Sequence, residues 1–154
     1  MRARAIALTL CTVATMGLAS CSKPTPGVTV WTGDTSVQQD AVCWAPDSTA
    51  LSAISQCIQQ AVSDPNIQVP TIPVTPGQVI GINVDGEIAD AGWTPSVSQQ
   101  SLAPSTLHQN YYRFDYPSID TPAQGFLLTI TAHGQDDSSS RGLWLFRLVP
   151  SGTL

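Results

Sequence analysis

The sequence predicts a mainly β protein: an immunoglobulin-like β-sandwich of seven or eight strands with one short helix, preceded by a signal peptide. Two observations lead to this prediction. From residue 67 onward, short segments alternate between apolar and polar residues, and Gly, Pro, Asn and Asp separate them at intervals typical of turns. Residues 49–63 instead repeat apolar side chains at helical spacing. No internal repeat is evident, so we expect one folded domain.

The N-terminal segment has the organisation of a bacterial export signal. Arg2 and Arg4 precede the apolar run 5–18, which is too short to span about 30 Å of hydrocarbon. The next residues, Leu-Ala-Ser-Cys at 18–21, resemble the lipobox of bacterial lipoproteins, in which the Cys receives a diacylglyceryl group and becomes the new N-terminus. We therefore expect a lipoprotein signal peptide at 1–20 and a lipid anchor on Cys21, which would hold the protein at the outer face of the cell membrane. An ordinary secretory signal with an incidental Cys is the alternative.

The rest of the chain is long enough for one domain. Removing residues 1–20 from the 154 leaves 134, enough to bury a core. We place the lipidated N-terminus and a tether at 21–27, which reaches at most about 20 Å, and the β-sandwich domain at 28–154. This part carries four Lys and Arg against eleven Asp and Glu, a formal net charge of −7. So few cations argue against a nucleic-acid partner and against a domain lying flat on anionic lipid.

Cysteine use agrees with export. Cys11 falls within the signal peptide and Cys21 is assigned to lipidation, which leaves Cys43 and Cys57 as a pair in an oxidising compartment. We predict a disulfide between them, which would contribute about 3 kcal/mol by the chain-entropy model. A redox-active pair is the alternative, although the spacing is not that of a Cys-x-x-Cys motif.

Two strands and the helix are expected before residue 67. The first strand is expected at 28–32, followed by a tight turn at Gly33-Asp34 and a returning strand at 36–44. The helix is expected at about 49–63, and Pro65 ends it. Its apolar face and the neighbouring cysteine comprise Leu51, Ile54, Cys57, Ile58, Ala61 and Val62.

The remainder is expected to be β. An extended segment at 67–74 contains Pro70 and Pro73, which cannot donate to a ladder and so indicate an edge strand. The last segment, 142–149, is apolar on both faces and should be central or covered. The other expected strands are 78–84, 93–98, 111–116 and 125–132, with a turn or single helical turn at 86–92 and an exposed loop at 134–142.

Four segments carry a resemblance to a known family. They are Pro76-Gly77-Gln78, the run Glu-Ile-Ala-Asp-Ala-Gly-Trp at 87–93, Tyr-Tyr-Arg-Phe at 111–114 and Gly-Leu-Trp-Leu-Phe-Arg-Leu at 142–148. Over roughly residues 74–149 the chain resembles a group of small actinobacterial membrane-anchored lipoproteins. That group has no assigned function. The resemblance implies a location and a compact domain, and it supplies no catalytic residues.

Two sets of polar residues, and one further histidine, are candidates for catalytic or metal sites. His133 with Asp136 and Asp137 could ligate a divalent ion, and Glu87 with Asp90 could form a paired-carboxylate site. A solvated loop and a capped turn explain these residues better, because adjacent Asp side chains diverge and Asp and Glu favour turns. His108 is likewise expected in a solvated loop. We therefore expect no catalytic residue, no metal and no cofactor.

The aromatic residues supply the remaining candidate site. Tyr111 and Tyr112 adjoin, so in a strand they face opposite sides and one can be exposed. Trp93 and Tyr111 are therefore candidates for a platform that binds a glycan or a peptide, with core packing as the alternative for most aromatics.

We expect the protein to be a non-catalytic binding or interaction domain close to the membrane. The lipid on Cys21 is its expected membrane contact, and another envelope protein is its expected partner. A small-ligand or glycan carrier is the first alternative, and an envelope hydrolase using Glu87 and Asp90, or a metal at His133, is the second. The sequence does not specify the oligomeric state.

Overall fold

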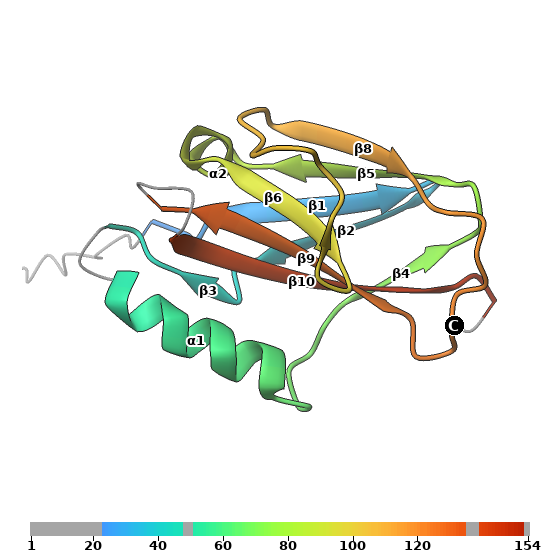
Figure 1. Ribbon diagram of the computed structural model, residues 1–154, viewed down its shortest axis with the longest axis horizontal. Helices are drawn as coiled ribbons and strands as arrows, with labels where there is room; N and C mark the ends of the chain where they lie inside the picture. The colour runs from blue at the N-terminus through green and yellow to red at the C-terminus, as the bar shows by residue number, and fades with distance from the viewer. Residues whose placement is uncertain (1–22, 48–50, 135–138, 153–154) are drawn as a thin grey trace, which may run out of the picture.

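The computed structural model shows a mainly β chain whose strands form two sheets packed against each other, with a helix against one of them (Figure 1). It describes residues 23–47, 51–134 and 139–152. The mainly β architecture predicted from the sequence is confirmed. The described residues contain ten strands rather than seven or eight, and two of these strands have only two residues each.

The first sheet has four strands in the order β2-β1-β5-β8, all paired antiparallel. Its strands are β1 (Gly27–Thr32), β2 (Thr35–Asp40), β5 (Val79–Val84) and β8 (Tyr111–Asp115). Gly33 has a φ of 51° in the turn between β1 and β2, as expected for the first position of that turn. On β5, Ile80 and Ile82 are fully buried, as the alternation predicts.

The second sheet has the order β3-β10-β9-β6-β7, and β4 runs parallel to β10 beside β3. Its strands are β3 (Cys43–Trp44), β4 (Thr71–Val74), β6 (Trp93–Val97), β7 (Gln100–Ser101), β9 (Phe126–His133) and β10 (Ser140–Pro150). The predicted central position of the last strand is confirmed, because β9 pairs with one side of β10 and β3 and β4 pair with the other.

The predicted returning strand at 36–44 is wrong beyond Asp40. There β2 ends, and the chain crosses to the other sheet, where β3 pairs with β10. The backbone N–H of Val42 donates to Leu143 O at 2.9 Å, and that of Ala45 donates to Arg141 O at 2.8 Å. The crossing buries Cys43 beneath the helix, whereas a continuous β2 would leave this part of the chain at the edge of the first sheet.

The core between the sheets is rich in large side chains. Trp93, Trp144 and Phe146 are fully buried there, together with aliphatic residues from both sheets. The indole N–H of Trp144 donates to Pro26 O at 3.1 Å. The segment that enters the domain is therefore held by a core side chain, because a buried N–H needs a partner.

Helix α1 (Leu51–Ser63) forms a second, smaller core with the outer face of β10. The prediction of a helix is confirmed over these residues, whereas Thr49 and Ala50 lie outside the described residues. Ile54 and Ala61 are buried against Leu143 and Leu145. Val62 was expected on the apolar face but is 58% exposed, so that part of the prediction is wrong.

The disulfide between Cys43 and Cys57 ties α1 to β3, as predicted. The two Cα atoms are 6.0 Å apart. Because β3 is only two residues long, the covalent bond holds the helix to a strand that has few ladder hydrogen bonds of its own.

The hairpin between β6 and β7 contains two unusual backbone conformations. Ser98 and Gln99 have φ values of 49° and 71°, in a left-handed region that residues other than Gly and Asn disfavour.

We expect Gln99→Gly to raise the free energy of unfolding by about 0.5–1 kcal/mol, measured by urea denaturation, because it relieves the backbone strain at this position. The matched control is Gln100→Gly in the strand itself, which should be destabilising. Equal destabilisation by both variants would contradict the prediction.

Candidate functional site

The candidate carboxylate pair lies beside contacts that hold the N-terminal segment. Helix α2 (Gly86–Ala91), the helical one of the two alternatives expected for residues 86–92, carries Glu87. One carboxylate oxygen of Glu87 pairs with Lys23 Nζ at 2.6 Å, and the other pairs with the Arg141 guanidinium at 3.1 Å. The Asp85 carboxylate accepts the backbone N–H of Gly27 at 2.7 Å, and Asp90 is exposed. These contacts fix the start of the domain.

Among the described residues, the two histidines form no hydrogen bond or ion pair with these carboxylates. His133, at the end of β9, makes a 2.8 Å hydrogen bond with the hydroxyl of Thr94. His108 is exposed between β7 and β8. Asp136 and Asp137, the candidate metal ligands beside His133, lie outside the described residues. In the part of the chain that is described, no group of three or more His, Cys, Asp or Glu side chains is placed to hold a metal ion.

The interpretation of Trp93 as part of an exposed platform is wrong. Its side chain is fully buried between the sheets, and its indole N–H donates to Gln109 O at 2.9 Å. The ring lies edge-on to Tyr112, with 6.4 Å between centroids. Trp93 is the first residue of β6 and begins its inward-facing set, so the alternation of this strand places it in the core.

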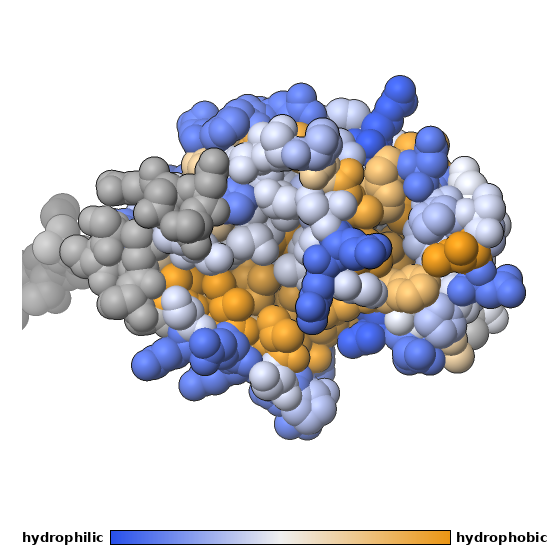
Figure 2. Space-filling model, in the orientation of Figure 1, coloured by the Kyte–Doolittle hydropathy of each residue, from blue (hydrophilic) through white to orange (hydrophobic). Residues whose placement is uncertain are grey.

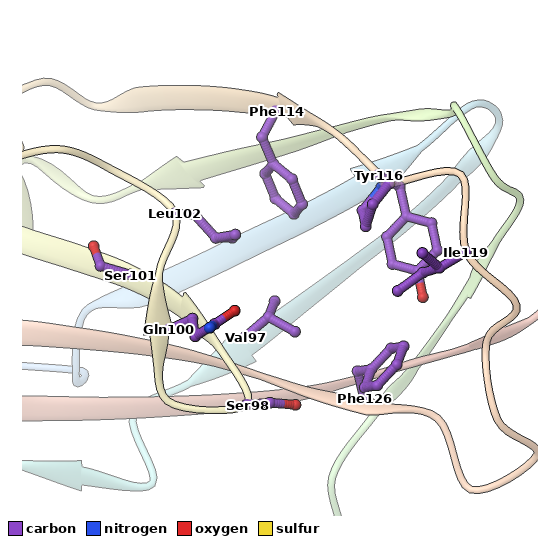
Figure 3. A pocket seen from close by; sticks show the side chains of 10 residues that line it. Val97, Ser98, Gln100, Ser101, Leu102, Phe114, Tyr116, Ile119 and Phe126 are labelled. Atoms are coloured by element: carbon purple, nitrogen blue, oxygen red, sulfur yellow. The ribbon is translucent and has the colours of Figure 1, made fainter.

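An apolar pocket with a cavity volume of about 230 Å³ lies between residues of the first and second sheets. In Figure 3, Phe114 points down from β8, Tyr116 points down from the position directly after β8, and Val97 points toward them from β6. In the same view Ile119 and Phe126 lie to the right of Val97. The lining is completed by Ser98, Gln100, Ser101, Leu102 and Pro117.

The pocket combines aromatic walls with a polar rim. Ser98 and Gln100 come from the strained hairpin, so the backbone conformation at this turn sets one side of the opening. On the other side Ile119 is 49% exposed. Figure 2 shows hydrophobic residues on this side of the molecule both along α1 and toward the end of β8. A concave apolar site with a few polar groups is the usual form of a binding site.

The pocket lies between two strands at the edges of their sheets. β8 is the last strand of the first sheet, and β7 is the last of the second. Tyr116 N–H donates to Gln78 O at 2.8 Å, and Val84 N–H donates to Asn110 O at 2.8 Å. The alternation of an antiparallel ladder then turns the backbone N–H and C=O groups of residues 111, 113 and 115 away from β5. No strand among the described residues pairs with that side of β8.

A second exposed feature lies on the outer face of the first sheet. Tyr111 on β8 is 39% exposed, and its ring is nearly parallel to that of Trp31 on β1. The sequence identified Tyr111 as a candidate but not its pairing with Trp31. The available signal was the alternation of β1, in which Val28 and Val30 face the core and Trp31 therefore faces outward.

Comparison with known proteins adds no assignment. No protein-family model, curated protein or solved structure matches the chain. Among the helices of the described residues, none is both long and apolar enough to cross a membrane.

Proposed function

We propose that this protein is an exported, lipid-anchored and non-catalytic binding domain that captures an extended apolar segment of another cell-envelope protein. The observation that supports this proposal is the apolar pocket between the edge strands β7 and β8. Export and the anchor on Cys21 are supported by the signal-like residues 1–20 and the lipobox resemblance. The antiparallel pairing within two facing sheets supports an immunoglobulin-like class of sandwich.

An extended peptide matches both components of this site. A peptide that adds to the open side of β8 would form main-chain hydrogen bonds with residues 111, 113 and 115, and alternate side chains of the peptide would point toward the sandwich. The pocket behind Phe114 offers space for such a side chain. Its volume of about 230 Å³ is smaller than the roughly 300–1,000 Å³ of sites for drug-sized ligands, so one or two apolar side chains fill it.

The position of the pocket suits a partner beyond the membrane surface. The tether is held at one end of the sandwich, because Lys23 pairs with Glu87 and Pro26 O accepts the indole N–H of Trp144. Figure 1 shows that β1 begins at this end and that β8 runs toward the other end. A domain anchored through Cys21 would therefore present the pocket away from its tether, where segments of envelope proteins are accessible.

The test is site-specific photo-crosslinking in cells with the full-length protein. A photoreactive residue at position 119 should capture a partner, and the same residue at position 62 on α1 should not. Ile119 and Val62 are 49% and 58% exposed, so the two positions are matched in accessibility. Mass spectrometry should locate the crosslink in an extended apolar segment, and Cys21→Ala should reduce the capture.

A binding measurement then decides whether the pocket is responsible. A synthetic peptide with the captured sequence should bind the full-length protein in detergent, and Ile119→Asp should raise the Kd at least tenfold because it places a charge on the apolar rim. Val62→Asp should leave the Kd unchanged. Capture from both positions alike, or a peptide that binds Ile119→Asp as well as the native protein, would refute the proposal.

A further inference from the structure

The outer face of the four-stranded sheet carries an aromatic pair whose position is set by the register of three strands. Trp31 on β1 lies opposite Gly81 on β5, and Tyr111 on β8 lies opposite Asn83 on β5. Figure 1 shows β1, β5 and β8 side by side. Val30 and Thr32, on either side of Trp31, are buried and face the core. The indole of Trp31 therefore lies on the opposite face of the sheet.

The indole of Trp31 packs against the backbone of Gly81. A Cβ atom at position 81 would come within 2.2 Å of Trp31 Cε2 and within 2.5 Å of Trp31 Nε1, which is closer than atoms can approach. The ring therefore lies directly over the backbone of β5. The missing side chain at this position lets a large aromatic ring lie against the sheet rather than stand away from it.

The rings of Trp31 and Tyr111 form one ordered surface. Their planes differ by 6°, and their centroids are 6.4 Å apart. The exposed fraction of Tyr111 is 39%, although a large aromatic side chain is more stable when buried. Two parallel, partly exposed rings fixed before any ligand arrives reduce the entropy that binding would otherwise cost.

Polar side chains surround the two rings on the same face. Thr29 lies opposite both Gln38 and Asn83, and Arg113 lies opposite Gly81. Hydroxyl, amide and guanidinium groups provide hydrogen-bond donors, and the first two also provide acceptors. Figure 1 labels the four strands that bring these groups together.

We propose that this face, centred on Trp31 and Tyr111, is a second binding site whose ligand is an uncharged polysaccharide. A pyranose ring has an apolar face of C–H groups, which packs on an aromatic ring, and hydroxyls at its edge, which suit the surrounding Thr, Gln and Asn side chains. This inference rests on the proposed export of the domain, because polysaccharides of this kind lie outside the cell membrane. It does not involve the pocket between β7 and β8.

The charge of this surface selects a neutral polymer. Asp40 on β2 and Asp115 on β8 share the outer face with Arg113, according to the alternation of their strands. The part of the chain after residue 20 has a formal net charge of −7. An anionic polymer would be repelled by the whole domain and would find one cation on this face, whereas an uncharged sugar carries no such penalty.

The test uses the full-length protein in a detergent without sugar headgroups, with cellohexaose and chitohexaose as neutral probes and polygalacturonate as the anionic probe. Isothermal titration calorimetry should show binding of at least one neutral probe. Trp31→Ala and Tyr111→Ala should each weaken that binding at least tenfold. The matched control is Val79→Ala, since Val79 is 37% exposed on the same face and lies opposite Asp115 rather than Tyr111, and it should leave binding unchanged.

Gly81→Ala tests whether binding depends on the packing of the Trp31 ring against the backbone of Gly81. It should displace the Trp31 ring and weaken binding of the neutral probe at least tenfold. If the variant does not fold, the double variant Gly81→Ala with Trp31→Ala removes the collision and should restore the fold, as judged by circular dichroism, but not the binding.

Three outcomes would overturn this inference: binding of neither neutral probe, tighter binding of polygalacturonate, or binding that is unchanged in both Trp31→Ala and Tyr111→Ala. The pocket variant Ile119→Asp should bind sugar normally, and Trp31→Ala should still bind the captured peptide. Failure of this site is therefore distinguishable from failure of the proposed function.

Discussion

Replacement of Trp144 by alanine is expected to lower the free energy of unfolding by about 3–5 kcal/mol, measured by urea denaturation of the full-length protein. The side chain is fully buried between the sheets, and its ring lies 5.9 Å from that of Trp44. Truncation would leave a cavity in the middle of β10, the strand that pairs with β9, β3 and β4. It would also leave Pro26 O without the indole donor.

Two control variants separate the causes of this loss. Trp144→Phe retains much of the ring but removes the N–H, so it should cost about 1–3 kcal/mol from the unpaired carbonyl together with a smaller cavity term. Trp44→Ala removes the partly buried neighbour, which contacts the Arg141 guanidinium at 4.6 Å, and should cost less than Trp144→Ala. A loss below about 1 kcal/mol in Trp144→Ala would show that this part of the core is not packed as described.

Much of this fold could be predicted from local patterns. The alternation at Ile80 and Ile82 and the helical spacing of Ile54 and Ala61 identify their buried faces without tertiary information. The last strand was predicted to be central because both of its faces are apolar, and the structure covers one with the opposite sheet and the other with α1. The disulfide followed from the even number of remaining cysteines.

The crossing after Asp40 was not predictable in the same way. Residues 36–44 contain no Gly or Pro that would mark the end of a strand. Only the competition between pairing with β1 and pairing with β10 decides where the chain changes sheets. That competition depends on Cys43 reaching α1, which is a tertiary contact. Local periodicity carries no information about it.

The candidate sites were predictable only in part. Tyr111 was identified from its adjacency to Tyr112, but its partner Trp31 lies 80 positions earlier in the sequence. The two rings meet because a single strand, β5, lies between β1 and β8 in the sheet. The pocket likewise joins a hairpin near Ser98 to a loop at Ile119. Both depend on strand order, which a single sequence does not encode in any local pattern.

The opposite ends of the domain have different physical roles. At one end Glu87 connects Lys23 to Arg141, whose guanidinium also donates to the carbonyl oxygens of Ala45 and Pro46. This network joins the segment before β1, α2 and the segment before α1, so this end of the domain is fixed by polar contacts. The pocket end is instead formed by apolar side chains around a strained hairpin.

Loss of the disulfide between Cys43 and Cys57 is expected to lower the free energy of unfolding by about 3 kcal/mol, because the bond closes a loop with a sequence separation of 14 residues. For a domain of this size such a loss corresponds to a fall in Tm of about 10 °C. The effect should begin at α1, since this helix covers Leu143 and Leu145 and the bond cross-links it to β3. Amide hydrogen exchange in α1 should therefore accelerate more than exchange in β9.

The measurement compares thermal unfolding of the native protein and of the double variant Cys43→Ala with Cys57→Ala, each with and without a reductant. Reductant should lower the Tm of the native protein toward that of the variant and leave the variant unchanged. Because the alanines remove little apolar volume next to Ile54 and Ala45, most of the loss would come from the cross-link itself. If hydrogen exchange accelerated equally in α1 and β9, the helix would not be the part of the domain that the disulfide holds, and the role assigned to the bond would be wrong.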